Sequence, residues 1–322
     1  MRQFAKPTIV VSKCLEFDAC RYNGEMIPDV TIRNLQPFVT FIPVCPEVEI
    51  GLGTPRETIR IVEENGENRL VQPSTREDVT EKMEQFSNDF LQTIPDVDGF
   101  ILKNRSPSCG TRDVKIYSGF EKAPAKGKGS GLFGGAVVKK FSHLPIEEEG
   151  RLSNFIIREH FFTRLFTIAY YKMIKHNKNM KDLVSFQSDN KYLFMAYNQV
   201  KQKELGRIIA NHKNEKIEVV FENYEKTLYE LFMRTPRYTS NVNVCEHIFG
   251  YFKTKLKKQE KDHFIELLQK YAEKKIPLSS LLTILKSWAI RFDEKYLLRQ
   301  TYFEPYPEAL VEISDSGKGR DY

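Results

Sequence analysis

Residues 7–14 read PTIVVSKC, a β-branched apolar run followed by a lysine and a cysteine. Residues 38–45, FVTFIPVC, are a second apolar run that ends at a cysteine, and residues 99–103, GFILK, form a third apolar run. Each run is bounded by turn residues and is apolar almost throughout, which is typical of strands buried on both faces of a parallel sheet. The first half of the chain is therefore predicted to be a Rossmann-like α/β domain with a parallel sheet.

A helix is predicted between the second and third runs, at residues 74–94. Its apolar residues recur at helical spacing, and Ser74 with Glu77 matches the capping box that begins many helices. Residues 122–135 are rich in glycine and lysine and predict a loop or a tight turn into a helix. Three of these glycines match the dinucleotide-binding spacing, but no predicted strand precedes them and no acidic residue follows at the required distance. We therefore expect no nucleotide cofactor.

The second half of the chain has a different pattern. From residue 146 onward, long amphipathic stretches follow one another closely, and prolines fall between them, where they end helices without cost. This pattern predicts an all-α helical bundle. We therefore divide the sequence into an α/β domain at residues 1–142, a helical domain at residues 146–313 and a disordered tail at residues 314–322.

The composition and the charge limit the possible classes of protein. Among the 322 residues, 41% are hydrophobic and 29% charged, which excludes disordered and fibrous proteins. No apolar run reaches the length of a signal peptide's core or of a membrane span, so we expect a cytoplasmic protein with no membrane partner. Residues 1–140 hold 19 Lys/Arg and 19 Asp/Glu, and residues 141–322 hold 30 and 24. The excess of +6 in the second half indicates a polyanion partner there, with a solvated helical surface as the alternative.

The five cysteines are Cys14, Cys20, Cys45, Cys109 and Cys245, an odd number that favours metal binding or catalysis over disulfides in a reducing compartment. Cys14, Cys45 and Cys109 each follow a predicted strand, and the carboxyl ends of parallel strands meet at one crevice. Three thiolates there would ligate three irons of a [4Fe–4S] cluster and leave the fourth open, or hold zinc with an open position. Three buried structural cysteines are the alternative. Cys20 is interpreted as a neighbouring thiol rather than a fourth ligand, and Cys245 as a core residue.

Polar residues that a buried scaffold would not need lie next to these cysteines. Glu47 and Glu49 follow Cys45 closely, and Ser106 and Ser108 precede Cys109 in a turn with little side-chain bulk. A carboxylate beside an open metal position is suited to act as a general base on water, and a nearby hydroxyl to relay a proton.

Three motifs carry a resemblance to a known family. They are SKCL at 12–15 with CRYNG at 20–24, PVCPE at 43–47 with TPR at 54–56, and RSPSCG at 105–110 with Ile116 and Tyr117. Together they resemble the TudS-type thiouracil desulfidase family over roughly residues 7–140. The helical half resembles the YbgA-like domain through REHF at 158–161, KYL at 191–193 and ELGR at 204–207. The fused arrangement is similar to that of RudS-type enzymes, which remove sulfur from 4-thiouridine in tRNA.

This resemblance implies a [4Fe–4S] cluster with three cysteine ligands, Cys14, Cys45 and Cys109, and one open iron. It also implies a catalytic carboxylate at Glu47 and a catalytic serine at Ser106, with Ser108 as the second choice. The expected reaction is a non-redox, hydrolytic conversion of 4-thiouridine in tRNA to uridine, with release of hydrogen sulfide. One departure is the stretch EFDA at 16–19, where the family has a glycine-containing segment, and it argues against free thiouracil as the preferred substrate.

Two other functions remain open from the sequence. One is a desulfidase of free thiolated bases such as thiouracil, in which the helical half serves oligomerisation. The other is a redox-sensing regulator that binds nucleic acid and whose cluster reports oxygen. A zinc site is the alternative for the metal.

An RNA substrate would be held by cations of the second half, which would make its binding depend steeply on salt. The candidates for phosphate contact are Arg151, Arg158, Arg164, Lys172, Lys175, Lys178, Lys253, Lys255, Lys257 and Lys258. Aromatic residues at helical spacing are predicted to be core residues rather than RNA-stacking residues: Phe161, Phe162, Tyr170 and Tyr171. His160 is interpreted as a hydrogen-bonded helix residue rather than a ligand.

Overall fold

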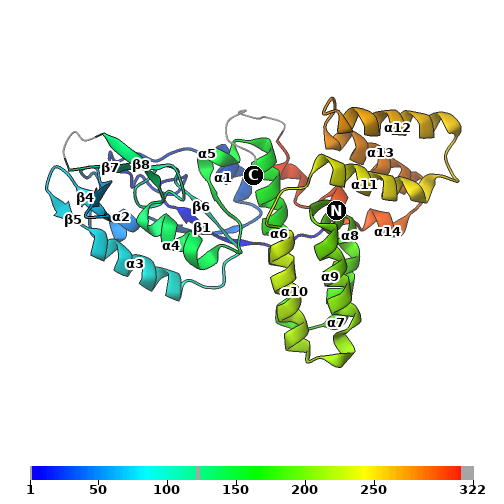
Figure 1. The fold of residues 1–322 in the computed structure, drawn as a ribbon, viewed down its shortest axis with the longest axis horizontal. Helices are drawn as coiled ribbons and strands as arrows, with labels where there is room; N and C mark the ends of the chain where they lie inside the picture. The colour runs from blue at the N-terminus through cyan, green and yellow to red at the C-terminus, as the bar shows by residue number, and fades with distance from the viewer. Residues whose placement is uncertain (1, 121–123, 313–322) are drawn as a thin grey trace. The chain divides into compact units, whose positions relative to one another are not determined.

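A parallel sheet forms the centre of the first part of the chain in the computed structural model, which describes residues 2–120 and 124–312 (Figure 1). Its strand order is β2-β1-β6-β9, and every pair in it is parallel. The strands are β1 (Thr8–Ser12), β2 (Thr40–Val44), β6 (Gly99–Leu102) and β9 (Ile146–Glu148). Residues of β1 and β6 such as Val10 and Phe100 are fully buried, because helices cover the sheet. The predicted parallel sheet is confirmed, and all three predicted strands belong to it.

A second sheet was not predicted from the sequence. Its order is β5-β4-β3-β7-β8, with antiparallel hairpins at both ends and a parallel β3/β7 pair between them. The strands are β3 (Arg60–Glu64), β4 (Glu67–Gln72), β5 (Glu77–Asp78), β7 (Val114–Tyr117) and β8 (Ala125–Gly129). These strands are short and rich in charged residues, so they lack the apolar runs that identified the first sheet. The prediction of a loop over residues 122–135 was wrong where β8 lies, but the tight turn into a helix is present at Gly131.

Helices connect and flank the strands of this part of the chain. They are α1 (Val30–Leu35), α2 (Pro46–Glu49), α3 (Thr80–Thr93), α4 (Leu132–Phe141), α5 (Glu149–Leu152) and α6 (Phe155–Asn177). The predicted capping box at Ser74 and Glu77 was wrong, because Glu77 pairs in β5 and α3 begins only at Thr80. Asp78 Oδ1 accepts from the main-chain N–H of Thr80 at 2.9 Å instead.

The chain divides into two compact units within α6, between Ala169 and Tyr170, and the first unit also includes residues 309–312. The α/β unit extends past residue 146 because β9 pairs with β6 and the first half of α6 packs beneath the sheet, where Phe4 contacts Phe166 edge to face at 5.9 Å. The helical range predicted from the sequence begins earlier, at residue 146. The predicted disordered tail at 314–322 lies outside the described residues.

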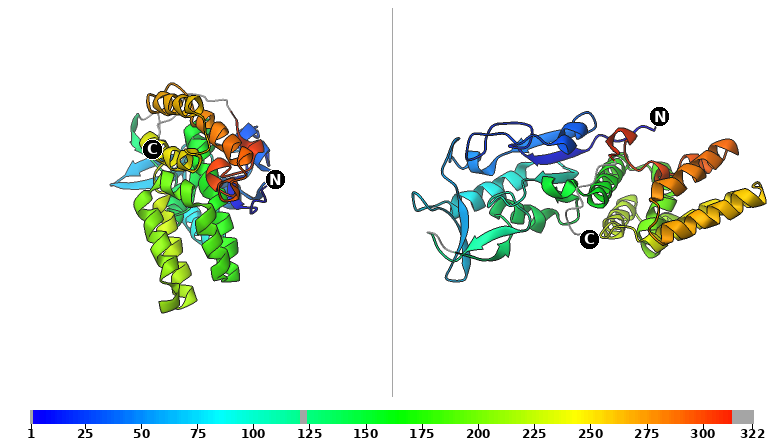
Figure 2. Two further views of the ribbon diagram at one scale, coloured as in Figure 1. Left: turned by 90° about the vertical axis from the view of Figure 1, so that its right-hand side faces the viewer. Right: turned by 90° about the horizontal axis from the view of Figure 1, so that it is seen from above.

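The helical unit has the all-α composition predicted for it, as the green to orange ribbon in Figure 2 shows. Its helices are α7 (Met180–Asp189), α8 (Lys191–Tyr197), α9 (Gln199–Ala210), α10 (Ile217–Leu231), α11 (Tyr238–Phe249), α12 (Lys258–Ala272), α13 (Leu278–Arg291) and α14 (Lys295–Leu298). Short 3-10 turns join them at His212–Asn214, Gly250–Phe252, Thr301–Phe303 and Glu308–Leu310. The core is aromatic, with Tyr171 stacked on Tyr224 at 5.4 Å, and Cys245 is fully buried in it, as predicted. None of the helices described has the length and apolar character needed to cross a membrane.

Candidate active site

Four cysteines line one cavity of about 430 Å³ at the carboxyl edge of the parallel sheet: Cys14, Cys20, Cys45 and Cys109. Cys14 follows β1 after one intervening residue, Cys45 directly follows β2 as the residue before α2, and Cys109 lies in the loop after β6. The strands are parallel neighbours, so their ends bring these residues to the same place from positions far apart in the sequence.

Cys20, Cys45 and Cys109 are buried and Cys14 is half-buried, and the thiols affect one another's pKa. Burial, together with Cys45, raises the pKa of Cys14 to about 12. The pKa of Cys20 is raised to about 12 by burial and by Cys45, and that of Cys109 is raised by burial and by its cysteine neighbours. A positively charged group in the cavity would compensate several thiolates at once, so the donor set fits a cationic, sulfur-ligated centre.

The four thiols lie in the wall of the cavity. Within the described part of the chain, no three His, Cys, Asp or Glu side chains are arranged to hold a single metal ion.

Glu47 is oriented by Arg56, an arginine of the TPR motif to which the sequence assigned no role. Glu47 lies in the first turn of α2, and its Oε2 accepts from Nε of Arg56 at 2.8 Å and from Nη2 at 2.6 Å. The pair is largely withdrawn from solvent, with 4% of the Arg56 side chain and 13% of the Glu47 side chain exposed. A buried charge-assisted pair with fork geometry holds a carboxylate in one orientation.

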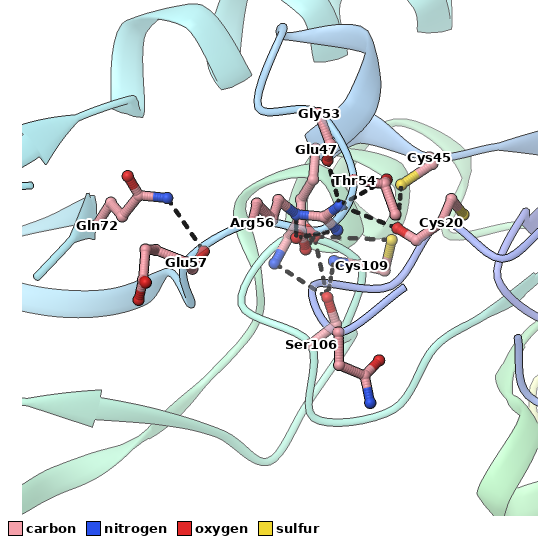
Figure 3. Close-up of polar contacts among 12 residues, drawn as sticks. Cys20, Cys45, Glu47, Gly53, Thr54, Arg56, Glu57, Gln72, Ser106 and Cys109 are labelled. Carbon is pink, nitrogen blue, oxygen red and sulfur yellow. Dashed lines mark hydrogen bonds and ion pairs between the residues drawn. The ribbon is translucent and has the colours of Figure 1, made fainter. Parts of the chain in front are cut away.

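Arg56 also ties together the chain segments around the cavity (Figure 3). Its Nη1 donates to the carbonyl of Cys20 at 3.0 Å and to that of Gly53 at 2.8 Å, and its main-chain N–H donates to the carbonyl of Tyr22 at 2.8 Å. One guanidinium group therefore links the Glu47 carboxylate, the Cys20 loop and the turn before β3. Arg56 belongs to the TPR motif, nine residues after Glu47, but the sequence does not show that the two side chains meet.

A chain of hydroxyl groups leads from Glu47 to Ser106. The fully buried Ser108 donates from Oγ to Glu47 Oε1 at 2.5 Å, and its Oγ lies 2.9 Å from Ser106 Oγ. Ser106 Oγ also accepts from the main-chain N–H groups of Ser108 at 3.3 Å and Cys109 at 3.1 Å. These two main-chain donors hold the Ser106 hydroxyl beside Ser108, at the wall of the cavity.

The loop that carries the two serines rests on the N-terminus of α4. The main-chain N–H groups of Gly131, Leu132 and Gly134 donate to carbonyls of residues 107–110 at 2.7 to 3.2 Å. This approach requires glycine, because a Cβ at Gly134 would lie 2.3 Å from the carbonyl oxygen of Cys109. The glycines that match a dinucleotide motif therefore serve close backbone packing.

Two glutamates at the end of β9 hold the other side of the same loop, and the sequence analysis missed both. Glu148 Oε1 accepts from the main-chain N–H of Thr111 at 2.7 Å and that of Arg112 at 3.2 Å. Glu149 accepts from the main-chain N–H of Asn104 at 2.7 Å and forms an ion pair with Lys103. These buried acids fix both ends of the segment that carries Ser106, Ser108 and Cys109.

The cations predicted to contact RNA lie in varied surroundings. Arg158 is buried, and its guanidinium donates to the carbonyls of Leu152 at 2.7 Å and Glu312 at 3.1 Å. Several others have acidic partners: Arg151 with Glu147, Lys175 with Glu225, Lys178 with Glu218 and Lys255 with Glu294. Arg164 donates to the carbonyl of His143, and Lys172 is half-buried. Lys178 and Lys255 are exposed in spite of these ion pairs, and Lys253, Lys257 and Lys258 are exposed as well.

The aromatic residues of α6 are placed largely as predicted. Phe161, Phe162 and Tyr171 are buried, whereas Tyr170 is 39% exposed. His160 is a buried helix residue, and burial lowers its pKa to about 3.

This architecture is an α/β domain whose strand ends present thiols, a carboxylate and hydroxyls to one cavity, followed by a helical domain. Residues 9–149 match the family described as 2-thiouracil desulfurase, and residues 191–307 match a family described as a protein of unknown function (DUF1722). The uncharacterized protein YbbK of Bacillus subtilis (strain 168) is 36% identical over 118 residues, which cover 34% of this chain and 77% of YbbK. The uncharacterized protein YbgA of Escherichia coli (strain K12) is 23% identical over 156 residues, which cover 48% of this chain and 92% of YbgA.

The chain belongs to the 2-thiouracil desulfurase family through its α/β part, and it carries a YbgA-like helical part. Among solved structures, that of the [4Fe-4S]-dependent thiouracil desulfidase TudS matches with a TM-score of 0.36 at 26% identity, covering 46% of this chain and 93% of that one.

Proposed function

We propose that this protein is an iron–sulfur-dependent desulfidase that converts 4-thiouridine in tRNA to uridine and releases hydrogen sulfide. The observation that carries the proposal is the hydrogen-bonded chain Glu47–Ser108–Ser106 beside a cavity lined by four cysteines. The family supports removal of sulfur from a thiolated pyrimidine. The basic surface of the helical unit and the departure at residues 16–19 favour a nucleoside within RNA over a free base.

Cys14, Cys45 and Cys109 would hold a [4Fe–4S] cluster with one iron free of protein ligands, and Cys20 would remain a neighbouring thiol. Such a cluster is held by several cysteine thiolates, and the cavity wall supplies thiols from different parts of the chain. When bound, the cluster supplies a soft Lewis acid that polarises the thiocarbonyl group of the substrate.

Glu47 is placed to act as the general base. Of the four lone-pair positions on its carboxylate, Arg56 fills two and Ser108 fills one, which leaves one position on Oε1 for a water molecule. Glu47 takes a proton from this water as the water oxygen bonds to the ring carbon that carries the sulfur.

Ser108 and Ser106 return protons to the leaving group. The proton on Glu47 passes through Ser108 to Ser106, whose hydroxyl faces the cavity and delivers it to the departing sulfur. The carbon–sulfur bond breaks as the carbonyl forms, and both protons of the water end on the sulfur as hydrogen sulfide. The reaction consumes one water and transfers no net electrons.

The test is anaerobic incubation of the reconstituted full chain with thiolated tRNA, with free 4-thiouridine and with free thiouracil. Sulfide and the loss of the near-ultraviolet absorbance of the thiolated base are measured together. The proposal expects turnover on tRNA with a higher kcat/KM than on either small substrate. Turnover on thiouracil alone would instead assign a free-base desulfidase, and tRNA binding that changes with cluster oxidation without sulfide release would assign a regulator.

The part played by the helical unit is tested in the same full chain. We expect Lys253→Gln with Lys257→Gln to weaken tRNA binding and to reduce its dependence on salt, because each lost phosphate contact lowers the slope by roughly 0.7 to 0.9. Unchanged tRNA affinity in this variant would remove these two lysines from the proposed contact surface.

A further inference from the structure

Positive charge in the α/β unit is concentrated in the segment that forms one side of the cavity. Residues 1–102 hold 10 Lys/Arg against 17 Asp/Glu, whereas residues 103–140 hold nine against two. The first 140 residues therefore appear neutral only because an acidic stretch and a basic stretch cancel. The basic stretch contains the serine loop and the β7–β8 hairpin.

Four exposed cations of this stretch form what we call the basic rim: Arg105, Arg112, Lys115 and Lys128. Arg105 lines the cavity itself. Lys115 of β7 lies directly opposite Lys128 of β8, strands that run side by side in Figure 1. Like charges in directly opposed cross-strand positions destabilise a hairpin, so the fold alone gives no reason for this pairing.

The rim has one acidic partner among the described residues, Asp113. Lys128 contacts its carboxylate at 3.0 Å, and Lys128, Arg105 and Arg112 together lower its pKa, which places these cations around a single acid. The side chains of Arg105, Arg112 and Lys115 form no hydrogen bond or ion pair within residues 2–120 and 124–312. An exposed ion pair such as Lys128–Asp113 contributes little, so Lys128 is readily available to another anion.

We infer that the basic rim binds the phosphodiester backbone of the RNA strand whose thiolated base enters the cavity, an inference that rests on the proposed function. A base must leave its stack to reach a reaction site, and its sugar and the neighbouring phosphates then remain at the mouth of the cavity. Arg105 at the cavity wall and the row of cations beyond it match an anion with charges repeated along a strand. Arginine supplies paired donors for phosphate oxygens, and lysine supplies a point charge.

Lysine on an edge strand also protects a sheet from pairing with another chain, and β8 is an edge strand. That role accounts for lysine on β8 alone. It does not account for Lys115 on the inner strand β7 or for the arginines in the loop before it.

The experiment compares two triple variants of the full chain. The rim variant carries Arg112→Gln, Lys115→Gln and Lys128→Gln, which leaves the cavity-lining Arg105 in place. The matched control carries Lys6→Gln, Lys82→Gln and Lys139→Gln, three exposed cations elsewhere in the same unit. Binding of tRNA is measured by fluorescence anisotropy across a range of salt, and folding is monitored by circular dichroism.

We expect the rim variant to bind tRNA roughly tenfold or more weakly at 0.15 M salt, with a log–log salt slope smaller in magnitude by about 2 to 3. Its kcat/KM on free 4-thiouridine should stay within about twofold of the parent chain. If the rim variant matches the control variant in affinity and in salt slope, the inference is overturned. It is also overturned if the rim variant aggregates but keeps its affinity for tRNA, because the cations would then serve to protect the sheet edge.

A third arm uses 4-thiouridine monophosphate, which separates a single phosphate from a polymer. An equal loss on the monophosphate and on tRNA would overturn the polymer assignment in favour of one nucleotide phosphate. If the parent chain neither binds tRNA nor acts on it, the proposed function is overturned. If the parent chain is active on tRNA and the rim variant is unaffected, only this inference is overturned.

Discussion

In the α/β unit, charged and polar side chains at the cavity hold one another in place, whereas in the helical unit the largest buried side chains are aromatic and the ion pairs lie at the surface. Glu47 is hydrogen-bonded to both Arg56 and Ser108, and all three side chains are largely withdrawn from solvent. In the helical unit, Tyr171 stacks on Tyr224, while Lys178 pairs with Glu218 in the open.

This difference separates chemistry from stability. Burying a polar group costs free energy unless its hydrogen bonds are satisfied, so a buried polar network marks a place where the side chains are needed for more than packing. Surface ion pairs contribute little, and a positive net charge therefore does not locate a binding surface by itself. Each prediction below tests one side of this comparison, beginning with the largest effect.

Replacing Glu47 by glutamine should abolish the base without changing the shape of the buried network. We expect sulfide release to fall by roughly 10² to 10⁴, the usual contribution of a positioned general base, while the visible spectrum of the cluster persists. Glu49→Gln, on an exposed carboxylate of the same short helix, is the matched control and should keep its activity. Full activity of Glu47→Gln would show that the buried network is structural.

Arg56→Lys keeps the charge and loses the fork that orients Glu47. We expect kcat to fall by roughly 10- to 100-fold with little change in KM, because a lysine cannot hold the carboxylate and the Cys20 carbonyl in the same geometry. Partial recovery of kcat in Arg56→Ala on addition of guanidinium ion would identify Arg56 as a positioning residue. A change in stability alone, with kcat unaffected, would contradict that role.

Alanine substitutions at two glycines compare the closely packed cavity loop with the exposed surface of the helical unit. In Gly134→Ala the new Cβ meets main-chain carbonyl oxygens at 2.3 and 2.4 Å, so we expect a loss of about 1 to 3 kcal/mol in the free energy of unfolding and lower activity. In Gly206→Ala, within α9, the Cβ meets nothing within 4 Å, and we expect a gain of about 0.5 to 1 kcal/mol. Denaturant titration of both variants checks the signs, and equal signs would contradict the comparison.

His160 should make the stability of the protein depend on pH. Burial lowers its pKa from 6.5 to about 3. Above pH 6.5 the residue is neutral in both states; as the pH falls toward 3, the unfolded chain binds a proton that the folded chain excludes, so stability is lost across this window. The loss at pH 5 should be about 2 kcal/mol.

The measurement is the free energy of unfolding at pH 7 and at pH 5. His160→Asn should remove most of the difference between the two, whereas His176→Asn, an exposed histidine of the same helix, should leave it unchanged. An undiminished pH dependence in His160→Asn would mean that other groups cause it.

The smallest effect is expected at the surface of the helical unit. Both members of the Lys178–Glu218 pair are about half exposed, so Lys178→Met should change the free energy of unfolding by less than about 0.5 kcal/mol. A loss of several kcal/mol on denaturant titration would show that surface pairs stabilise this unit more than its aromatic core suggests.

Much of the first sheet was predictable because its strands are buried on both faces and therefore read as continuous apolar runs. The strands of the second sheet mix charged and apolar residues without a regular period, as in RIVEE of β3 and ENRLVQ of β4, and β8 reads AKGKG, so little in their local sequence distinguishes them from loops. The capping box at Ser74 and Glu77 was misleading for a related reason. Glu77 and Asp78 pair with β4 and form the strand β5, so the helix begins after them.

The site residues divide in the same way. Glu47 and Ser106 were predicted because they lie next to cysteines in the sequence, and the structure places both at the cavity beside those cysteines. Three contacts join residues that are 9 to 45 positions apart in the sequence, and no local pattern indicates them. They are Arg56 with Glu47, Glu148 with Thr111, and Glu149 with Asn104. Charge counting was misleading in the first half, since a net of zero concealed a basic segment next to the cavity.

The sequence by itself determined the two kinds of architecture, the thiols at the ends of strands and the family, because apolar periodicity and short motifs are local properties of a chain. Only the tertiary structure decided which groups act together: the fork between Arg56 and Glu47, the hydroxyl chain through Ser108, and the gathering of cations around Asp113. Hydrogen bonds and electrostatic interactions depend on distances in space, and those distances are set by the pairing of strands and the packing of α4 against the serine loop.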